Sequence, residues 1–217
     1  MPQHIDQVYE LLSKTGLQRK SGNIIYSGYE TLSLGDYYFL GVNPGGHIDD
    51  KNPKEDQIIT KLIKKKEYPE ENEYFDGIWG KERLPGVHHH QQNIQAFFEC
   101  LEIDLRKVLS TNLCFQRSPG TSKYPGGKSQ MEADIQKFWP IHEYMLSVVK
   151  PKVIICNGAD ARDYFKKIIN PTKIEIFDMP YPWRGRIQKC TYFSGNLYLK
   201  SLLQDLGRLK VIATPHL

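Results

Sequence analysis

The stretch "YYFLGVNPGG", residues 37–46, joins an apolar, aromatic run to a turn that contains asparagine, proline and two glycines. The run at 37–42 is short and apolar, which predicts a buried strand and the first strand of a core sheet. Two glycines alone would indicate only a turn. Asn43 makes this turn a candidate for chemistry, because ligands of open α/β sheets bind outside the carboxyl ends of the strands.

Strand and helix patterns alternate along the rest of the chain. Further strands are predicted at 108–115, 152–158, 173–177, 191–195 and 208–217. Helical spacing of apolar residues predicts helices at 5–12, 93–109, 131–149 (bent or begun at Pro140), 159–169 and 196–207. This alternation predicts an α/β fold, a three-layer α/β/α sandwich with a central, mostly parallel sheet of about four to five strands.

Length and composition favour one folded domain. The chain has 217 residues, of which 40% are hydrophobic, and this is enough to bury a substantial core. Residues 49–90 are dense in charge, proline and glycine, and we interpret them as a polar insertion over the strand ends. We therefore expect a single domain over residues 1–217 with an insertion at about 49–90.

The charge and the apolar runs limit the partners. The formal net charge is +4, which permits contact with phosphates but is no electrostatic signature of it. No apolar stretch approaches the length of a membrane span, and the N-terminus lacks the layout of a signal peptide. We expect a soluble intracellular protein, cytoplasmic or, in a eukaryote, nuclear, with no membrane partner.

Motifs for metals and nucleotides are weak. The four cysteines are far apart, and the histidines at 88–90 have no acidic or thiol partner at ligand spacing. "GGKSQ", 126–130, lacks the strand and the earlier glycine of a P-loop, and no G-x-G-x-x-G opens a helix. "KLIKKK", 61–66, could contact phosphates or form a solvated helix face. We expect no metal and no nucleotide cofactor.

Four motifs carry a resemblance to a known family. They are "GVNPGG" (41–46), "STNLCFQRSPG" (110–120), "KVIICNG" (152–158) and "ATPHL" (213–217). Their order resembles the uracil-DNA glycosylase superfamily, particularly its GxNPG-type mismatch-specific and single-strand-selective monofunctional branches, over residues 36–217. The resemblance implies a base-excising DNA-repair hydrolase that acts on uracil or a related modified base by base flipping. Its partner would be single-stranded or mismatched DNA, and it would work as a monomer without a cofactor.

The resemblance also assigns roles to single residues. Asn43 would orient the attacking water, and His216 would donate a hydrogen bond to the uracil and stabilise the departing anion. Asn112 would read the base edge, because one amide complements the N3–H donor and the O4 acceptor of uracil. Gly45 stands where the strictest branch has a tyrosine, which implies a permissive pocket. The rest of the base pocket falls on Gly41, Val42, Pro44 and Phe75, with Trp79 as an alternative stacking ring.

Two segments offer groups for a nucleic-acid backbone. The loop at 116–129 mixes glycines, hydroxyls and cations, and "YPWRGR" at 181–186 adds an aromatic ring and two arginines. Backbone amides, hydroxyls and cations all bind phosphate oxygens, although a mobile, solvated loop would have the same composition. The candidate contacts are Arg117, Ser118, Lys123, Lys128, Arg184 and Arg186.

Other interpretations stay open. Asn43 could cap its turn, Asn112 and Asn157 could bond backbone at strand ends, and His216 could be a surface residue. The family continues past its closing motif into a loop that wedges into the duplex, whereas this chain ends at Leu217. That ending favours a catalytically inactive relative that binds nucleic acid or a base. A hydrolase acting on another nucleoside or modified base is the third possibility.

Overall fold

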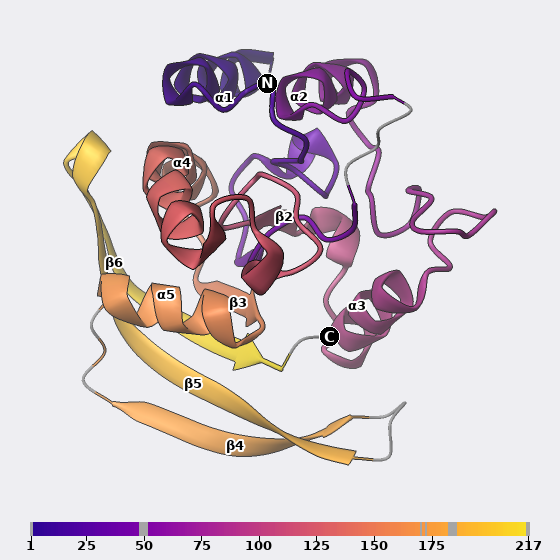
Figure 1. Ribbon diagram of the computed structural model, residues 1–217. Helices are drawn as coiled ribbons and strands as arrows, with labels where there is room; N and C mark the ends of the chain where they lie inside the picture. The colour runs from indigo at the N-terminus through magenta and orange to yellow at the C-terminus, as the bar shows by residue number, and fades with distance from the viewer. Residues whose placement is uncertain (1, 48–51, 170, 172, 182–185, 216–217) are drawn as a thin grey trace.

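The computed structural model describes residues 2–47, 52–169, 171, 173–181 and 186–215 (Figure 1). Its α-helices are α1 (Pro2–Thr15), α2 (Ile58–Glu67), α3 (His89–Cys100), α4 (Gly127–Val149) and α5 (Ala159–Ile169). Its strands are β1 (Tyr37–Gly41), β2 (Leu109–Asn112), β3 (Val153–Asn157), β4 (Ile174–Tyr181), β5 (Arg186–Leu199) and β6 (Gln204–Thr214).

The six strands form one sheet in the order β2-β1-β3-β6-β5-β4. Neighbouring strands among β2, β1, β3 and β6 are parallel, whereas β5 runs antiparallel to both β6 and β4. The predicted α/β sandwich with a mostly parallel central sheet and flanking helices is confirmed. The sheet has six strands, where about four to five were expected.

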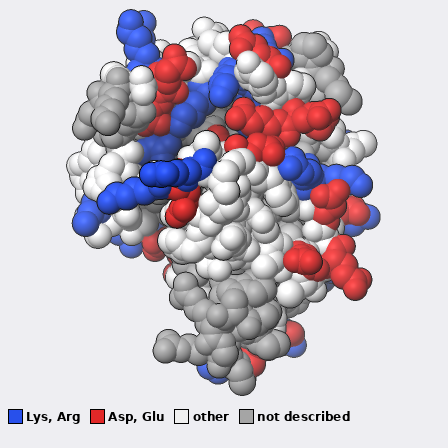
Figure 2. Space-filling model, turned by 90° about the vertical axis from the view of Figure 1, so that its right-hand side faces the viewer, with Lys and Arg blue, Asp and Glu red and all other residues white. Residues whose placement is uncertain are grey.

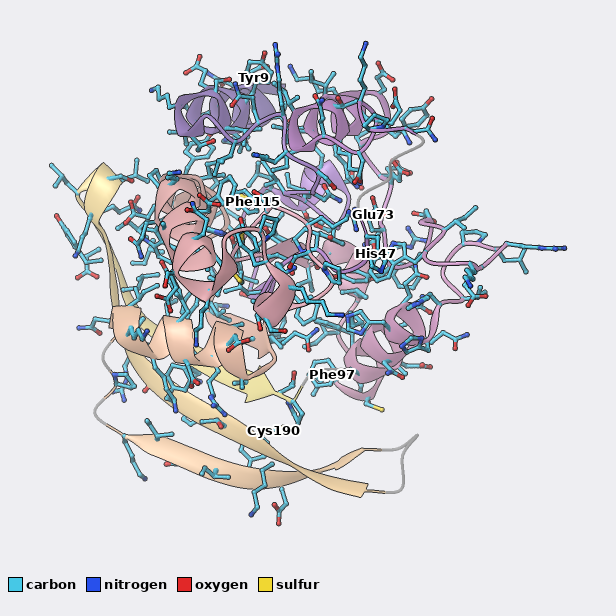
Figure 3. The ribbon with its side chains drawn as sticks, in the orientation of Figure 1. Tyr9, His47, Glu73, Phe97, Phe115 and Cys190 are labelled. Carbon is cyan, nitrogen blue, oxygen red and sulfur yellow. The ribbon has the colours of Figure 1, made fainter. Side chains whose placement is uncertain are left out.

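One face of the sheet carries most of the helices. Tyr38 and Leu40 of β1 and Ile154 of β3 belong to a core cluster that also contains apolar residues of α1, α2, α4 and α5. Phe115 lies in this cluster, in the interior beside α4 (Figure 3). Burial of these apolar side chains away from water is the main favourable term that holds the helices on the sheet.

The opposite face is covered by α3 and by the segment that precedes it. Phe39 and Ile155 point to this side, because successive side chains of a strand alternate between faces. The Phe39 ring lies edge-on to Phe98 of α3, with 5.1 Å between the ring centroids. Phe97 also lies between α3 and the sheet (Figure 3). The packing of these rings sets the position of α3 relative to β1.

The helix predicted at 196–207 is wrong. These residues complete β5, form the 3-10 turn η4 (Lys200–Leu202) and begin β6. Leu197 and Leu199 are buried while Asn196 and Tyr198 are exposed, which is the two-residue period of a strand. Leu203 adopts a left-handed conformation (φ 50°) that closes the hairpin. The apolar residues here were numerous enough for a helix, but their spacing was that of a strand.

Three other segments differ from expectation. The insertion at 49–90 contains helix α2, which buries Ile58 and Leu62 in the core. The helix expected at 93–109 ends at Cys100, so that its last predicted residue already belongs to β2. Helix α4 begins at Gly127, well before the predicted 131, and continues through Pro140. Among the described residues, no helix is both long enough and apolar enough to cross a membrane.

Candidate functional site

A cavity of about 340 Å³ lies at the carboxyl ends of β1, β2 and β3. Asn43 follows β1, Asn112 ends β2 and Asn157 ends β3, so that three side-chain amides meet at one edge of the sheet. The lining residues are Gly41, Val42, Asn43, His90, Asn112, Gly120, Thr121, Asn157, Gly158, Ala159 and Asp160. The arrowhead of β6 in Figure 1 points toward the side of the molecule that Figure 2 shows, where cationic and acidic side chains are interspersed.

Gly41 makes room for the Asn112 amide. The two residues are partners in the parallel register of β1 and β2. A Cβ atom on Gly41 would lie 2.1 Å from Asn112 Oδ1, which is far inside van der Waals contact. Asn112 is only 8% exposed, and its side chain shares a hydrogen bond with the Tyr26 hydroxyl. Burial raises the pKa of Tyr26, which keeps this hydroxyl protonated.

The Asn43 amide has a fixed orientation. Its Nδ2 atom donates to Pro44 O (2.9 Å), Ser118 O (3.1 Å) and Ser118 Oγ (3.0 Å). Two of these partners are carbonyl oxygens, which only accept, so the nitrogen must be the atom that faces them. Oδ1 therefore points the other way, and no described residue donates to it. It can accept a hydrogen bond from water or from a ligand in the pocket.

Two loops extend the pairing of β1 and β2 beyond the sheet. Backbone hydrogen bonds join them at Leu113 N to Gly41 O (3.0 Å), Cys114 N to Val42 O (2.8 Å) and Ser118 N to Pro44 O (3.0 Å). Ser118 is 2% exposed, and its hydroxyl also donates to Gly120 O at 2.9 Å. Ser118 thus faces inward, where it orients Asn43, and does not lie on the surface expected of a phosphate contact.

Arg117 is also engaged within the protein. Its guanidinium donates to both carboxylate oxygens of Asp56, at 3.3 and 3.2 Å, and to the Gly45 carbonyl. Asp56 further accepts from Lys61 at 2.6 Å and from the Ser21 hydroxyl. Burial raises the pKa of Asp56, but the bonds from Lys61 and Ser21 and the charge of Arg117 outweigh it and lower this pKa to about 2. Arg117 therefore ties the loop after β1 to a buried carboxylate.

A buried histidine supports the end of β2. His142 of α4 places Nε2 3.0 Å from Leu113 O and Nδ1 3.2 Å from the Tyr38 hydroxyl. Because a carbonyl only accepts, Nε2 carries the proton and Nδ1 accepts from Tyr38. Burial lowers the pKa of His142 to about 4, so the ring stays neutral at physiological pH. This hydrogen-bonded pair fixes the backbone directly after Asn112.

Pro44, Gly45 and Phe75 were predicted for the base pocket but are not among the residues that line this cavity. Lys123 and Lys128, predicted as nucleic-acid contacts, also lie outside it. The Phe75 ring packs in the cluster around α3, and the Arg106 guanidinium lies over this ring, 4.4 Å from the centroid. Lys123 is exposed in the 3-10 helix η3 (Thr121–Lys123). Lys128 lines a smaller cavity of about 100 Å³ that adjoins the first. The two cavities share Val42, Thr121 and Asp160.

Other predicted residues fall outside the description. His216, Arg184 and Trp183 lie outside the described residues. Arg186 is the first residue of β5, and its side chain is not described. Strand β6 ends at Thr214, the register partner of Asn157. The predicted roles of His216, Arg184 and Arg186 therefore stay predictions.

His90 is a pocket residue that the sequence did not single out. In the sequence it stands within the triplet at 88–90, which lacks the partners of a metal site. The structure places His88 as the N-cap of α3: its Nδ1 accepts from His90 N at 3.3 Å, and its own N–H donates to Gln91 Oε1 at 3.1 Å. The cap is built from histidine and glutamine and not from the usual serine or threonine, so no sequence signal marked this helix start or the place of His90 in the pocket.

Neither a metal site nor a similarity to known proteins indicates the function of this pocket. Among the residues that the structure describes, no three His, Cys, Asp or Glu side chains lie close enough together to hold a metal ion. Compared with known proteins, the chain matches no family model and no curated protein. The geometry of the pocket is therefore the main basis for a functional hypothesis.

Proposed function

We propose that this protein is a monofunctional DNA glycosylase that hydrolyses the N-glycosidic bond of uracil or a related modified base in DNA. Asn43 orients the attacking water, and Asn112 reads the base edge. The four motifs that resemble the uracil-DNA glycosylase superfamily support this proposal, together with the meeting of Asn43 and Asn112 in one pocket. The partner is single-stranded or mismatched DNA, and the protein works as a monomer without a cofactor.

The observation that carries the proposal is the orientation of the Asn43 amide. Pro44 and Ser118 hold its nitrogen, so in this pocket-lining side chain Oδ1 is the atom left to accept a hydrogen bond. A water that donates to Oδ1 keeps a lone pair for the sugar C1′ atom. Such positioning accelerates a reaction because the orientation is fixed before the barrier is reached.

The cavity suits a small, single-ring ligand. Its volume of about 340 Å³ is near the lower end of ligand pockets, which span roughly 300–1,000 Å³. In the proposed reaction the water oxygen bonds to C1′, and the C1′–N bond breaks with its electron pair leaving on the base. The proton that the water loses passes to solvent, and the base anion takes up a proton from solvent. The products are the free base and an abasic sugar. A base reached in this way must be extruded from any duplex that holds it.

A binding module is the second candidate. An amide oxygen can orient water but is too weak a base to deprotonate it, and Asp160 is the only carboxylate among the described lining residues. A protein with this pocket could retain a base without cleaving it. A hydrolase for another modified base would need the same Asn43 geometry but a different partner for Asn112.

A cleavage assay tests the proposal. End-labelled oligonucleotides with one uracil, single-stranded or opposite guanine, are incubated with the protein and then treated with alkali, which breaks the strand at abasic sites. We expect breaks with the wild type, a loss of about 100-fold or more with Asn43→Ala, and no loss with Asn196→Ala, an exposed asparagine of β5. Binding without breaks at protein excess would reject uracil excision and favour the binding module.

A further inference from the structure

The pocket contains one ring side chain among its described lining residues, and that ring is His90. The other lining residues are three asparagines, three glycines, Val42, Thr121, Ala159 and Asp160. Planar bases bind to proteins by stacking on aromatic side chains, since every base has a π-face. His90 is thus the side chain of this wall that can offer a flat face to a planar ligand.

The backbone at His90 is held firmly. His90 lies in the first turn of α3, where the His88 side chain caps the helix. The neighbouring Gln91 is fully buried and donates to Glu73 O (2.6 Å) and Gly77 O (2.8 Å). These bonds tie the start of α3 to the segment in front of it. A residue on such a rigid element can present its side chain with a defined direction.

The His90 ring is also backed by a second ring. Trp79 lies 6.1 Å from it between centroids, with the two planes inclined by 33°. Trp79 is in turn fixed by its Nε1 donor to Glu73 Oε2 at 3.2 Å and by its edge-on contact with Tyr74 at 5.7 Å. Trp79 itself does not line the pocket. The aromatic segment before α3 therefore reaches the pocket through His90.

We propose that His90 is a base-binding residue of the pocket and that its ring face supports the plane of a pyrimidine base. The inference rests on the proposed function for the identity of the base, and it holds equally for an enzyme and for a binding module. The contact is made by the face of the ring, so a benzene ring at this position serves as well as imidazole. It assigns to His90 the stacking contact expected of Phe75 or Trp79.

Equilibrium binding separates the ring from its nitrogens. The probe is a short single-stranded DNA with one uracil, compared with the same DNA carrying a stable abasic analogue, by fluorescence anisotropy in an Asn43→Ala background that prevents cleavage. The ratio of the two affinities isolates the contribution of the base. The variants are His90→Asn, which keeps polarity and loses the ring, and His90→Phe, which keeps a ring and loses the nitrogens. His89→Asn is the matched control, because His89 is exposed and does not line the pocket.

We expect the preference for uracil to fall about tenfold with His90→Asn and to stay within about twofold with His90→Phe and His89→Asn. An equal loss with both His90 variants overturns the inference in favour of a hydrogen bond from the imidazole. No loss with His90→Asn also overturns it. If the Asn43→Ala protein binds uracil DNA no more tightly than abasic DNA, both the pyrimidine ligand and the role of His90 are rejected. Preference for uracil without strand breaks in the cleavage assay rejects only the enzyme, and the stacking role is then decided by the His90 variants.

Discussion

The two ends of the sheet are built differently. At the β2-β1-β3 end, parallel strands are covered on both faces, by α1, α2 and α4 on one side and by α3 on the other. At the β6-β5-β4 end the strands alternate in direction, and no described residue of them belongs to the cluster around α3. Ile174, Ile176 and Phe177 of β4 are exposed apolar side chains. In Figure 1 α5 lies along β5, and β4 forms the outer edge of the sheet on the other side of β5.

Strand direction decides where a site can form in this sheet. Parallel strands bring all their carboxyl ends to one edge, so loops that are distant in sequence meet there. The proposed pocket uses three such loops, and Arg117, Ser118 and His142 fix the backbones of two of them, those after β1 and β2. An antiparallel hairpin joins neighbours in sequence and offers no comparable meeting point. We therefore expect the covered end to control activity and the hairpin end to affect mainly stability.

The largest effects should come from two glycine-to-alanine substitutions, one at each end of the sheet. Gly41→Ala would place a Cβ 2.1 Å from Asn112 Oδ1, and Gly195→Ala would place one 2.6 Å from the Ile169 carbonyl. The first change displaces the Asn112 amide that we propose reads the base, so uracil excision in the cleavage assay should fall about 100-fold or more. The second should lower the free energy of unfolding by about 1–3 kcal/mol through overpacking, with excision per folded molecule retained.

Chemical denaturation gives the control for this pair. Excision is compared at a temperature where both variants are folded. Equal losses of activity with Gly41→Ala and Gly195→Ala would contradict the assignment of function to the covered end.

The second comparison makes the same substitution on both ends. Ile155 of β3 is 1% exposed and Ile176 of β4 is 66% exposed. Ile155→Thr should lower the free energy of unfolding by about 3 kcal/mol, because it removes buried apolar volume and buries a hydroxyl. Ile176→Thr should change it by less than about 0.5 kcal/mol. Urea unfolding measures both, and a cost above 1 kcal/mol for Ile176→Thr would indicate that something covers this face in solution.

The third comparison concerns ion pairs and pH. The Asp56 side chain is 7% exposed, whereas Asp178 of β4, 3.6 Å from Lys189, is 59% exposed. The folded pKa of Asp56, about 2, is below its ordinary value of 3.8, so its stabilising effect is complete above about pH 4 and is lost as the pH falls toward 2. The loss should amount to about 2 kcal/mol.

Urea unfolding between pH 5 and 2 measures this effect. Asp56→Asn should flatten the acid limb of the profile, and Asp178→Asn should leave it nearly unchanged, since exposed ion pairs contribute about 0–1 kcal/mol. Identical acid limbs for wild type and Asp56→Asn would contradict the stabilising role of the buried carboxylate.

The sequence predicted the covered end better than the hairpin end. The short apolar runs at 37–42 and 152–158 correctly predicted β1 and β3. A strand that is buried on both faces is a continuous apolar run, which is easy to recognise in a sequence. The segment at 196–207 was mistaken for a helix. Its period of two was weak, since Leu202 and Leu203 at the turn are exposed apolar residues that belong to neither face. Turn geometry decided this segment, and local composition did not reveal it.

The site divides in the same way. Asn43 and Asn112 could be predicted from the sequence because one follows a strand and the other ends one, and the carboxyl ends of parallel strands meet at one edge of the sheet. The inward roles of Arg117 and Ser118 could not be predicted from the sequence. The composition of their loop is equally typical of a solvated loop that binds phosphate. Only the folded chain brings Asp56 beside Arg117 and the Ser118 oxygens beside Asn43.

Local sequence patterns and one rule of parallel sheets were enough to predict the α/β class, the first strands of the sheet, and Asn43 and Asn112 at its edge. The tertiary structure decided the direction of each side chain and the place of His90 in the pocket wall. His90 is 47 residues after Asn43 in the chain. It reaches the pocket because α3 packs through Phe98 on Phe39 of β1, a long-range contact that no local pattern encodes.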